Sequence, residues 1–518
     1  MRICKLIYVL YQIRLLSLVA LLRLASAIYA SGTNLMALLQ FAARTYGDKI
    51  ALADEQETLT YSQLYEQSKQ LSALLKMKYQ LVAGQRVGFL CKNHASLVKA
   101  IYAVSFTGAD IYLLNAEMSK DQLQAILESK DFQLVVYDEE LSALLEQTTY
   151  LNAKLLSYHP TYPGINNLSA TMVSKKQKQR RASSGKLVLL TGGTTGKAKE
   201  AAHQPSLFNY LDPFTAFLTR LQILNKHTAY IATPIYHGYG VAVLLLFCAL
   251  GKKVVIHRGF DAESACRLIR EHGVDIVTVV PLMVHKMLKT NADDLKSLSC
   301  IASGGAELNP KLVRETLSQL GEVLYNLYGT SEAGLNILAV PQDLAYSAHT
   351  IGRKIKGVHV KIMDDQKEEA PIGSVGQICI RNKWSMRNKA RTWIETGDLG
   401  CRDEKGYYFL RGRVDSMIVS AGENVYPFEV EQILLTHPFI EDAAVIGIAD
   451  ELFGQRLKAW IQLIPGTKMT KDELLDWLRT RLARFQLPKE ISFVEQLPYT
   501  PLGKLDKKAL NTNDHHSL

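Results

Sequence analysis

The stretch LVLLTGGTTGKAK, residues 187–199, decides the fold of this 518-residue chain. Its first four residues are all apolar, which is typical of a strand buried in a parallel sheet. Glycines and threonines follow directly, and glycine lets a backbone adopt positive φ and approach a ligand closely. The stretch therefore predicts a strand that ends in a phosphate-binding turn, with lysines just beyond the turn.

This turn is not the Walker loop of the P-loop proteins. That motif requires a glycine where Thr191 stands, and a serine or threonine where Ala198 stands. Taken alone, the run is also compatible with an ordinary surface turn rich in glycine and threonine. Its chemistry has to be decided by the rest of the sequence.

Short apolar runs alternate with amphipathic ones on both sides of this stretch. We expect buried strands at residues 85–90, 133–137, 229–233, 253–257, 274–280 and 300–302. Strands that alternate with amphipathic helices are typical of α/β layering with substantial parallel sheet.

A domain boundary is expected after the strand-like run GYYFLRG at 406–412. The chain beyond it has strand and helix patterns of its own, which suffice for a small separate domain. We therefore expect an α/β protein with an apolar, basic N-terminal segment, a large N-terminal domain of layered sheets and helices, and a small mobile C-terminal α+β domain, at residues 1–32, 33–414 and 415–518.

Residues 6–30 form the most apolar stretch of the chain. Gln12, Arg14 and Arg23 interrupt it, which disfavours a membrane span. A basic start and the small residues at 25–27 fit a signal peptide, but the intracellular chemistry inferred below disfavours export. Two further interpretations stay open: a helix in the membrane interface with its arginines at the headgroups, and a helix packed on the body of the protein.

The net charge of +10 comes from two places. The first thirty residues contain four cations and no acid, residues 174–186 contain six cations and no acid, and the rest is formally neutral. A nucleic-acid-binding protein more often spreads basic residues over one face, with aromatic residues between them. We expect no nucleic-acid partner, and we expect 174–186 to be an exposed loop.

Composition also restricts the class of protein. Hydrophobic residues make up 47% and charged residues 21%, which excludes a chain that is disordered throughout. Seven cysteines lie far apart and form no C-x-x-C pair, which disfavours a zinc finger or a disulfide scaffold. A reducing compartment fits better, so we expect a cytoplasmic protein, with peripheral contact to the inner face of a membrane if its first segment lies in the interface.

Further segments give the glycine–threonine turn its context. They are YHGYG, SGGAEL, YGTSEAG, TGD, GRVD, GENVYP and PLGK, at residues 236–240, 303–308, 328–334, 396–398, 412–415, 422–427 and 501–504. In this order they resemble the signature segments of the AMP-forming adenylating enzymes, which include acyl-CoA synthetases, luciferases and peptide-synthetase adenylation domains. The resemblance covers roughly residues 34–510 and is closest to the acyl-CoA ligases.

The resemblance implies a reaction in two steps. ATP, with Mg²⁺, activates a carboxylic acid to acyl-AMP with release of pyrophosphate, and the acyl group then passes to CoA. We expect the acid to be a medium- or long-chain fatty acid, because the chain begins with an apolar segment and has an apolar run at 241–247. That run could equally be ordinary core. Two alternatives remain: loading of a carrier-protein phosphopantetheine, and a nucleotide-binding protein that has lost turnover.

The same resemblance implies which residues hold ATP. The turn would cradle the β- and γ-phosphates, Tyr328 would lie against adenine, and Asp398 and Arg413 would bind the ribose. The complete ATP-binding set is Thr191, Gly192, Gly193, Thr194, Thr195, Gly196, Lys199, Gly305, Ala306, Glu307, Tyr328, Gly329, Asp398 and Arg413.

The resemblance also assigns the reacting centre. Thr330 would contact the α-phosphate, Thr191 and Glu332 would help to place Mg²⁺, and His237 would line the carboxylate or acyl channel. Lys504 would be the adenylation lysine, because a flexible ammonium can bridge carboxylate and α-phosphate oxygens.

Two more residues would serve the second step. Asp415 resembles the hinge about which the small domain swings, and Gly422 would then face the tunnel that admits CoA. Taken singly, the residues assigned by resemblance have plainer explanations, such as a solvated carboxylate, a core aromatic ring or a surface lysine. Their order along the chain favours the functional interpretation.

The sequence departs from the family pattern in three places. Gly192 stands where serine or threonine is usual, and Ala198 stands where proline is usual. Gly192 keeps a backbone N–H but lacks a hydroxyl, so we expect a looser phosphate cradle. Residues 381–394 are shorter and more basic than the family segment, which affects the entrance for the acid.

Overall fold

The structure is a computed structural model, which describes residues 11, 17–168, 185–191, 199–203, 211–330, 332–385, 392–420, 423–450, 454–500 and 503–512. Several residues of the predicted site lie outside this part of the chain: Gly192, Gly193, Thr194, Thr195, Gly196 and Gly422. Most of the basic stretch at 174–186 lies outside it as well.

The larger sheet has thirteen strands in the order β16-β17-β18-β19-β15-β14-β13-β12-β11-β9-β10-β1-β2. Its parallel part consists of β1 (Ile50–Ala53), β9 (Thr228–Ile231), β10 (Lys253–Ile256), β11 (Ile276–Val279), β12 (Cys300–Gly304) and β13 (Leu324–Thr330). Helices connect these strands, namely α10 (Gly238–Ala249), α11 (Ala262–His272), α12 (Pro281–Asn291) and α13 (Pro310–Leu320). This alternation is the α/β layering expected from the sequence.

The remaining strands of this sheet are antiparallel. They are β2 (Thr58–Thr60) at one edge and, toward the other, β14 (Gly334–Ala339), β15 (Thr350–Lys354), β16 (His359–Met363), β17 (Gly376–Arg381), β18 (Ile394–Arg402) and β19 (Tyr408–Arg413). The short α14 (Pro341–Tyr346) follows β14, and α9 (Leu211–Arg220) precedes β9.

A second sheet of six strands has the order β6-β5-β3-β4-β7-β8. Its strands are β3 (Arg86–Leu90), β4 (Asp110–Leu113), β5 (Leu134–Tyr137), β6 (Ala153–Leu156), β7 (Leu187–Thr191) and β8 (Lys199–His203), parallel except for the β7–β8 pair. Its helices are α4 (Tyr61–Tyr79), α5 (Ala95–Thr107), α6 (Lys120–Lys130), α7 (Ser142–Glu146) and α8 (Ile165–Leu168).

One apolar core joins the two sheets. Every residue of α5 is buried, and α10 buries most of the apolar run at 241–247, with Phe247 fully enclosed. This run packs in the same cluster as strands of both sheets. The run is therefore core, and it gives no support to the expectation of an acyl channel there.

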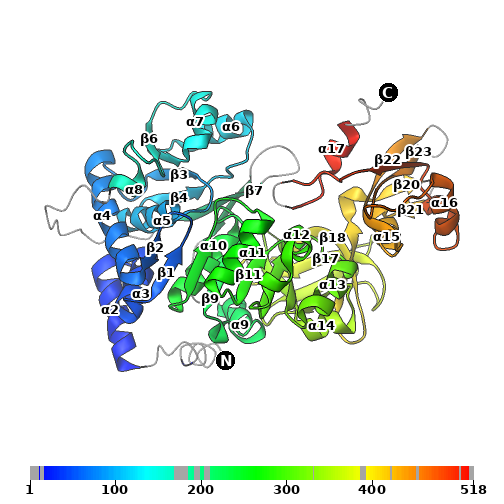
Figure 1. The fold of residues 1–518 in the computed structure, drawn as a ribbon, viewed down its shortest axis with the longest axis horizontal. Coiled ribbons are helices and arrows are strands. Elements are labelled where there is room, and N and C mark those ends of the chain that lie inside the picture. The colour runs from blue at the N-terminus through cyan, green and yellow to red at the C-terminus, as the bar shows by residue number, and fades with distance from the viewer. Residues whose placement is uncertain are drawn as a thin grey trace.

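The small domain has its own sheet and core (Figure 1). Its elements are β20 (Ile418–Ser420), β21 (Glu423–Val425), α15 (Pro427–Leu434), β22 (Ile440–Asp450), β23 (Gly454–Leu463), α16 (Lys471–Arg479), β24 (Glu490–Val494) and α17 (Lys507–Thr512). The last strand of the large sheet ends at Arg413, and the first strand of the small sheet begins at Ile418. The fold class expected from the sequence, a large layered domain followed by a smaller one, is confirmed.

The N-terminal part begins with α2 (Leu18–Ser31), which packs on α3 (Leu35–Tyr46). Within the described part of the chain, no helix is both long and apolar enough to cross a membrane. Six of the seven cysteines lie in this part, and all six are free and buried.

Candidate active site

The predicted site residues follow strands that end at one edge of the large sheet. His237 follows β9, Gly305 follows β12, and Thr330 ends β13. Val280, which was not among the predicted residues, follows β11 at the same edge. These four strands are parallel neighbours, so their carboxyl ends meet. Ligands of open α/β sheets bind at such an edge.

A chain of polar contacts lies beside this edge. The Tyr328 hydroxyl donates to Oδ2 of Asp398 at 2.7 Å, and Nη1 of Arg413 donates to Oδ1 at 2.9 Å. The contact to Arg413 follows from the pairing of β18 with β19, which sets Asp398 opposite Arg413. Burial, with the nearby Asp398 carboxylate, raises the pKa of Tyr328, so its hydroxyl stays protonated as a donor.

The same guanidinium reaches Asp415. Nε and Nη2 of Arg413 donate to the two carboxylate oxygens of Asp415 at 3.0 and 3.2 Å. These hydrogen bonds lower the pKa of Asp415. Asp415 lies in a single 3₁₀ turn, Val414–Ser416, between the last strand of the large sheet and the first strand of the small one. The predicted ribose residues and the predicted hinge residue are thus in one network.

The loop that carries Lys504 leaves the small domain and lies on the large domain (Figure 1). Gly503 is buried with φ of +68°, and a Cβ placed there would lie 2.6 Å from Cγ2 of Val280 and 3.3 Å from Cβ of Leu282. Hydrogen bonds to Thr500 close the loop, at 2.8 Å from the Gly503 amide and at 2.7 Å from the Thr500 amide to the Lys504 carbonyl. Only glycine allows this approach without strain.

The positive charge of Lys504 acts on His237. Burial lowers the pKa of His237 to about 4, with a further contribution from the positive charge of Lys504. The Nε2 atom of His237 is buried and has no hydrogen-bond partner among the described residues. At neutral pH the site therefore combines an exposed ammonium with an uncharged imidazole.

Contacts farther away hold the small domain in this position. Nε2 of Gln432 on α15 donates to Oε1 of Glu307 at 2.7 Å, and Nζ of Lys311 donates to the Ile440 carbonyl at 3.1 Å. Glu441 forms an ion pair with Lys289 on α12. Burial and the nearby Glu431 raise the pKa of Glu307, while the positive charge of Lys507 opposes this shift. Glu307 was expected to help bind ATP, and its contact across the domains was not expected from the sequence.

The hairpin after β13 is shaped by a buried tryptophan. Oγ1 of Thr330 accepts the Ala333 amide at 3.1 Å, which closes the turn that contains Glu332. Trp384 is almost fully buried, and its Nε1 donates to the Leu335 carbonyl at 3.1 Å. The sequence analysis treated 381–394 as an altered entrance and did not identify Trp384. Because Trp384 stands alone in a basic segment, the sequence around it does not indicate that its side chain is buried.

For the remaining described residues of the predicted ATP-binding set, the backbone positions show where they lie. Thr191 ends β7 and Lys199 begins β8, where the two residues are paired in register. Gly305 has φ of +82° directly after β12, followed by Ala306. Gly329 lies so close to the facing strand that a Cβ would be 2.4 Å from the Gly334 carbonyl oxygen. The structure thus brings the described members of the set to strand ends of the two sheets.

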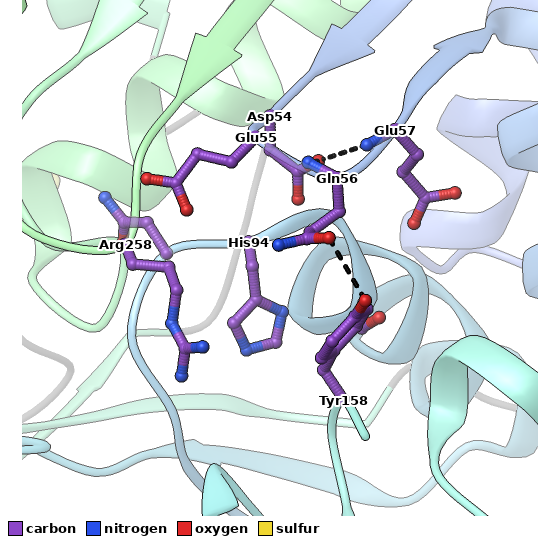
Figure 2. A pocket seen from close by; sticks show the side chains of 9 residues that line it. Asp54, Glu55, Gln56, Glu57, His94, Tyr158 and Arg258 are labelled. Atoms are coloured by element: carbon purple, nitrogen blue, oxygen red, sulfur yellow. Dashed lines mark hydrogen bonds between the residues drawn. The ribbon is translucent and has the colours of Figure 1, made fainter. Parts of the chain in front are cut away.

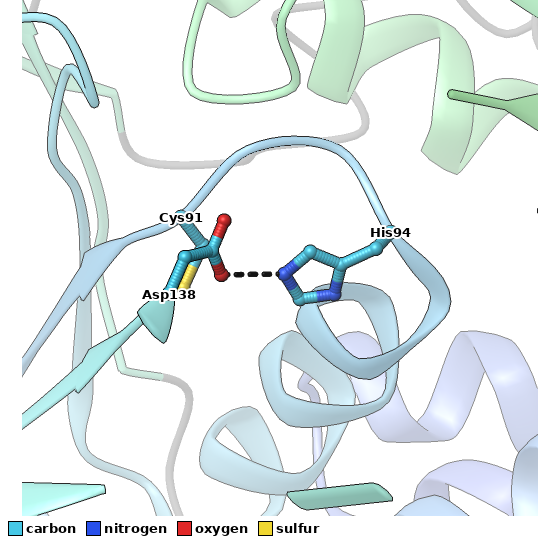
Figure 3. A group of neighbouring side chains, drawn as sticks. All are labelled: Cys91, His94 and Asp138. Atoms are coloured by element: carbon cyan, nitrogen blue, oxygen red, sulfur yellow. Dashed lines mark hydrogen bonds and ion pairs between the residues drawn. The ribbon is translucent and has the colours of Figure 1, made fainter. Parts of the chain in front are cut away.

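A second cluster, formed by Cys91, His94 and Asp138, has the composition of a metal site (Figure 3). The Leu97 amide donates to Nδ1 of His94 at 3.0 Å, so Nε2 carries the hydrogen and donates to Oδ1 of Asp138 at 2.8 Å. Both nitrogens are therefore engaged. The carboxylate also accepts from Ser157 at 2.5 Å and from the Lys92 amide at 2.9 Å. The cluster is a satisfied hydrogen-bond network, and it offers no open ligand to a metal.

A small pocket lies beside this network (Figure 2). Its polar side chains are paired: Gln56 accepts from the Tyr158 hydroxyl at 3.1 Å, and Glu57 accepts from Lys99 at 2.6 Å. None of its lining residues belongs to the predicted active site. We assign it no chemistry.

Comparison with known proteins agrees with this fold. The sequence model of the family described as AMP-binding enzyme matches residues 39–388, and that of the AMP-binding enzyme C-terminal domain matches residues 429–504. The chain therefore belongs to the AMP-binding enzyme family, and the resemblance to the AMP-forming adenylating enzymes is confirmed.

Individual relatives differ in substrate. A fatty acid–[acyl-carrier-protein] ligase of Streptomyces coeruleorubidus is 29% identical, over 89% of this chain and 92% of the relative. A 2-succinylbenzoate–CoA ligase of Bacillus cytotoxicus is 27% identical, over 89% and 95%. The o-succinylbenzoate CoA synthetase of Bacillus subtilis with its acyl-adenylate OSB-AMP has a TM-score of 0.78 at 24% identity, over 91% of this chain and 97% of that one. That synthetase is also known with ATP and magnesium. At this identity the structural likeness establishes the fold.

The buried Asp138 network predicts an acid-dependent loss of stability. Burial alone would raise the pKa of Asp138, but its hydrogen bonds, led by that from His94, lower it from 3.8 to about 2. Because the pKa of Asp138 is lower in the folded than in the unfolded protein, the ionised carboxylate stabilises the fold by about 2 kcal/mol at pH values above the unfolded pKa, which is about 4. This stabilisation is lost as the pH falls toward 2. Asp138→Asn should lower the free energy of unfolding at pH 7 by about 2–4 kcal/mol.

Thermal unfolding measured between pH 7 and pH 2.5 tests this prediction. The difference between wild type and Asp138→Asn should narrow below pH 4. The exposed Asp365→Asn is the matched control and should behave like wild type. A constant difference across the whole pH range would show that the Asp138 charge has no such role.

Proposed function

We propose that this chain activates a carboxylic acid at the carboxyl edge of the parallel strands and then transfers the acyl group to the thiol of CoA. In the first step a carboxylate oxygen bonds to the α-phosphorus of ATP, and pyrophosphate leaves. In the second step a thiolate sulfur bonds to the acyl carbon, and AMP leaves. The observation that carries the proposal is the lysine loop, with Gly503 against Val280 and Lys504 acting on His237.

The first step brings two negatively charged groups together, and their repulsion opposes the reaction. A carboxylate must approach a polyphosphate, so fixed positive charge at the reacting atoms should supply most of the catalysis. Lys504 would supply it. His237 is uncharged at neutral pH and does not compete for the anions, and its unpartnered Nε2 can make a hydrogen bond to the acid.

The ribose and the metal have fitting partners. Each oxygen of Asp398 accepts one hydrogen bond, from Tyr328 or from Arg413, and a carboxylate oxygen can accept a second one. Both ribose hydroxyls can therefore bind without displacing either partner. Glu332, half-buried beside Thr330, would offer Mg²⁺ the oxygen ligand that this ion prefers. The ion would neutralise phosphate charge when bound.

The acid is proposed to be a medium- or long-chain fatty acid. The relative from Streptomyces coeruleorubidus, named for a fatty acid, supports this choice. The same relative supports a second candidate function, in which a carrier-protein phosphopantetheine replaces CoA as acceptor. The two candidates share the first step and differ only in the thiol.

Pyrophosphate exchange with a panel of acids, followed by addition of CoA or a phosphopantetheinyl carrier protein, tests the function. Fatty acids should support exchange, and CoA should yield the thioester. Exchange that proceeds to thioester only with the carrier protein would select the second candidate. Absence of exchange with every acid would refute both.

Lys504→Ala should reduce acyl-adenylate formation by about a thousandfold, because the charge at the reacting atoms is lost. Thioester formation from supplied acyl-adenylate should continue near the wild-type rate, measured as acyl-CoA released. Lys468→Ala removes an exposed lysine of the same domain and serves as the matched control. Equal loss in both half-reactions would contradict the assigned role.

We further propose that Asp415 is the hinge about which the small domain turns toward the thiol step, when Gly422 would face CoA. Proline fixes φ, so Asp415→Pro should slow thioester formation about tenfold or more while sparing adenylate formation. Asp415→Ala removes the contact with Arg413 but leaves φ free, and it should retain the second step. A wild-type rate of thioester formation in the proline variant would rule out the hinge.

A further inference from the structure

The helix α2 packs in an unusual orientation. Its buried residues are small, namely Ala20, Ala27 and Ser31, and they face α3. A surface helix normally buries its large apolar side chains and exposes polar ones. Here Leu24 packs against the α2–α3 contact, but most of the large apolar side chains point away from the protein.

The outward face is formed by Leu18, Leu22 and Tyr29, which are 73%, 61% and 72% exposed. Their spacing of four and seven residues places them on one side of the helix, opposite Ala20 and Ala27. In Figure 1, α2 lies at the outer edge of the large domain. Three large exposed apolar side chains on one side of a helix indicate an interaction surface.

The helix is nevertheless held firmly in place. Ser17 caps its first turn by accepting the Ala20 amide at 3.2 Å. Ser31 is hydrogen-bonded to the Gln40 side chain at 2.8 Å, and Nη1 of Arg44 donates to Oγ of Ser26 at 2.5 Å. The apolar face is therefore presented by an ordered element of the fold.

Charge indicates what covers this face. The sequence has no aspartate or glutamate before Asp48, whereas it has five arginines and lysines up to that point. Two of them lie on α2 and its neighbour within the described structure: Arg44 on α3 contacts the exposed Ser26 of α2, and the partly buried Arg23 lies on the flank of α2, about 120° from the centre of the apolar face. Cations that flank an apolar helix face complement the headgroups and acyl boundary of an anionic bilayer. A helix of fourteen residues is about 21 Å long, too short to span.

We propose that α2 is a docking surface for an anionic lipid bilayer, with Leu18, Leu22 and Tyr29 inserted among the lipids and Arg23 and Arg44 at the headgroups. The helix lies in the plane of the interface while the rest of the large domain stays in water. This inference does not depend on the proposed function, since no residue of α2 belongs to the active site.

Sedimentation of the full chain with vesicles tests the proposal. The protein should sediment with vesicles of phosphatidylcholine and phosphatidylglycerol, and less with vesicles of phosphatidylcholine alone. The double variant Leu22→Gln/Tyr29→Gln should lose at least about tenfold in partitioning, because two apolar side chains no longer insert. Its thermal unfolding should resemble that of wild type.

The matched control is Leu151→Gln/Tyr162→Gln, which removes two exposed apolar side chains, 95% and 65% exposed, from another part of the large domain. It should bind vesicles as wild type does. Equal recovery of all three proteins would overturn the proposal. It would also be overturned if the wild-type chain formed dimers without lipid and the α2 variant were monomeric, because a second copy would then cover the face.

Discussion

The approach of the Gly503 backbone to the Val280 side chain is the contact on which the arrangement of the site depends. The small domain can bring Lys504 to the strand ends only because residue 503 lacks a Cβ, which would overlap with Val280. Once the loop lies there, the ammonium is near His237, and the contacts of Glu307 and Glu441 with the other domain fix the orientation. A mobile cation thereby becomes part of a site built by parallel strands.

The second element of the site is a relay of hydrogen bonds between strands. Tyr328, Asp398 and Arg413 are far apart in sequence but adjacent in the sheet, and Arg413 extends the network to Asp415. The residues proposed to hold the ribose are therefore linked to the residue proposed as hinge. Binding of nucleotide and rotation of the small domain would then compete for the same guanidinium.

Much of the fold could be predicted from the sequence, because apolar strands and glycine turns have strong local signals. The strand expected at 187–190 is β7, which extends one residue further to Thr191, and the small domain was recognised. Contacts between distant segments could not be predicted. Neither the ion pair of Glu441 with Lys289 nor the burial of Trp384 has a local pattern. The sequence left the run at 241–247 open between core and substrate contact, because an apolar helix has the same pattern in both, and the structure places it in the core. The N-terminal helix was expected to be interfacial or packed, and its small residues allow it to be packed on one side and apolar on the other.

The most direct test of the account is the rate of acyl-adenylate formation in Gly503→Ala, which keeps Lys504 but adds the Cβ that overlaps with Val280. Gly466→Ala is the control, because Gly466 also has positive φ, at +84°, but has open space around it. The account predicts that Gly503→Ala slows pyrophosphate exchange about tenfold or more while thioester formation from supplied acyl-adenylate persists, and that Gly466→Ala exchanges normally. Wild-type exchange in Gly503→Ala would contradict it.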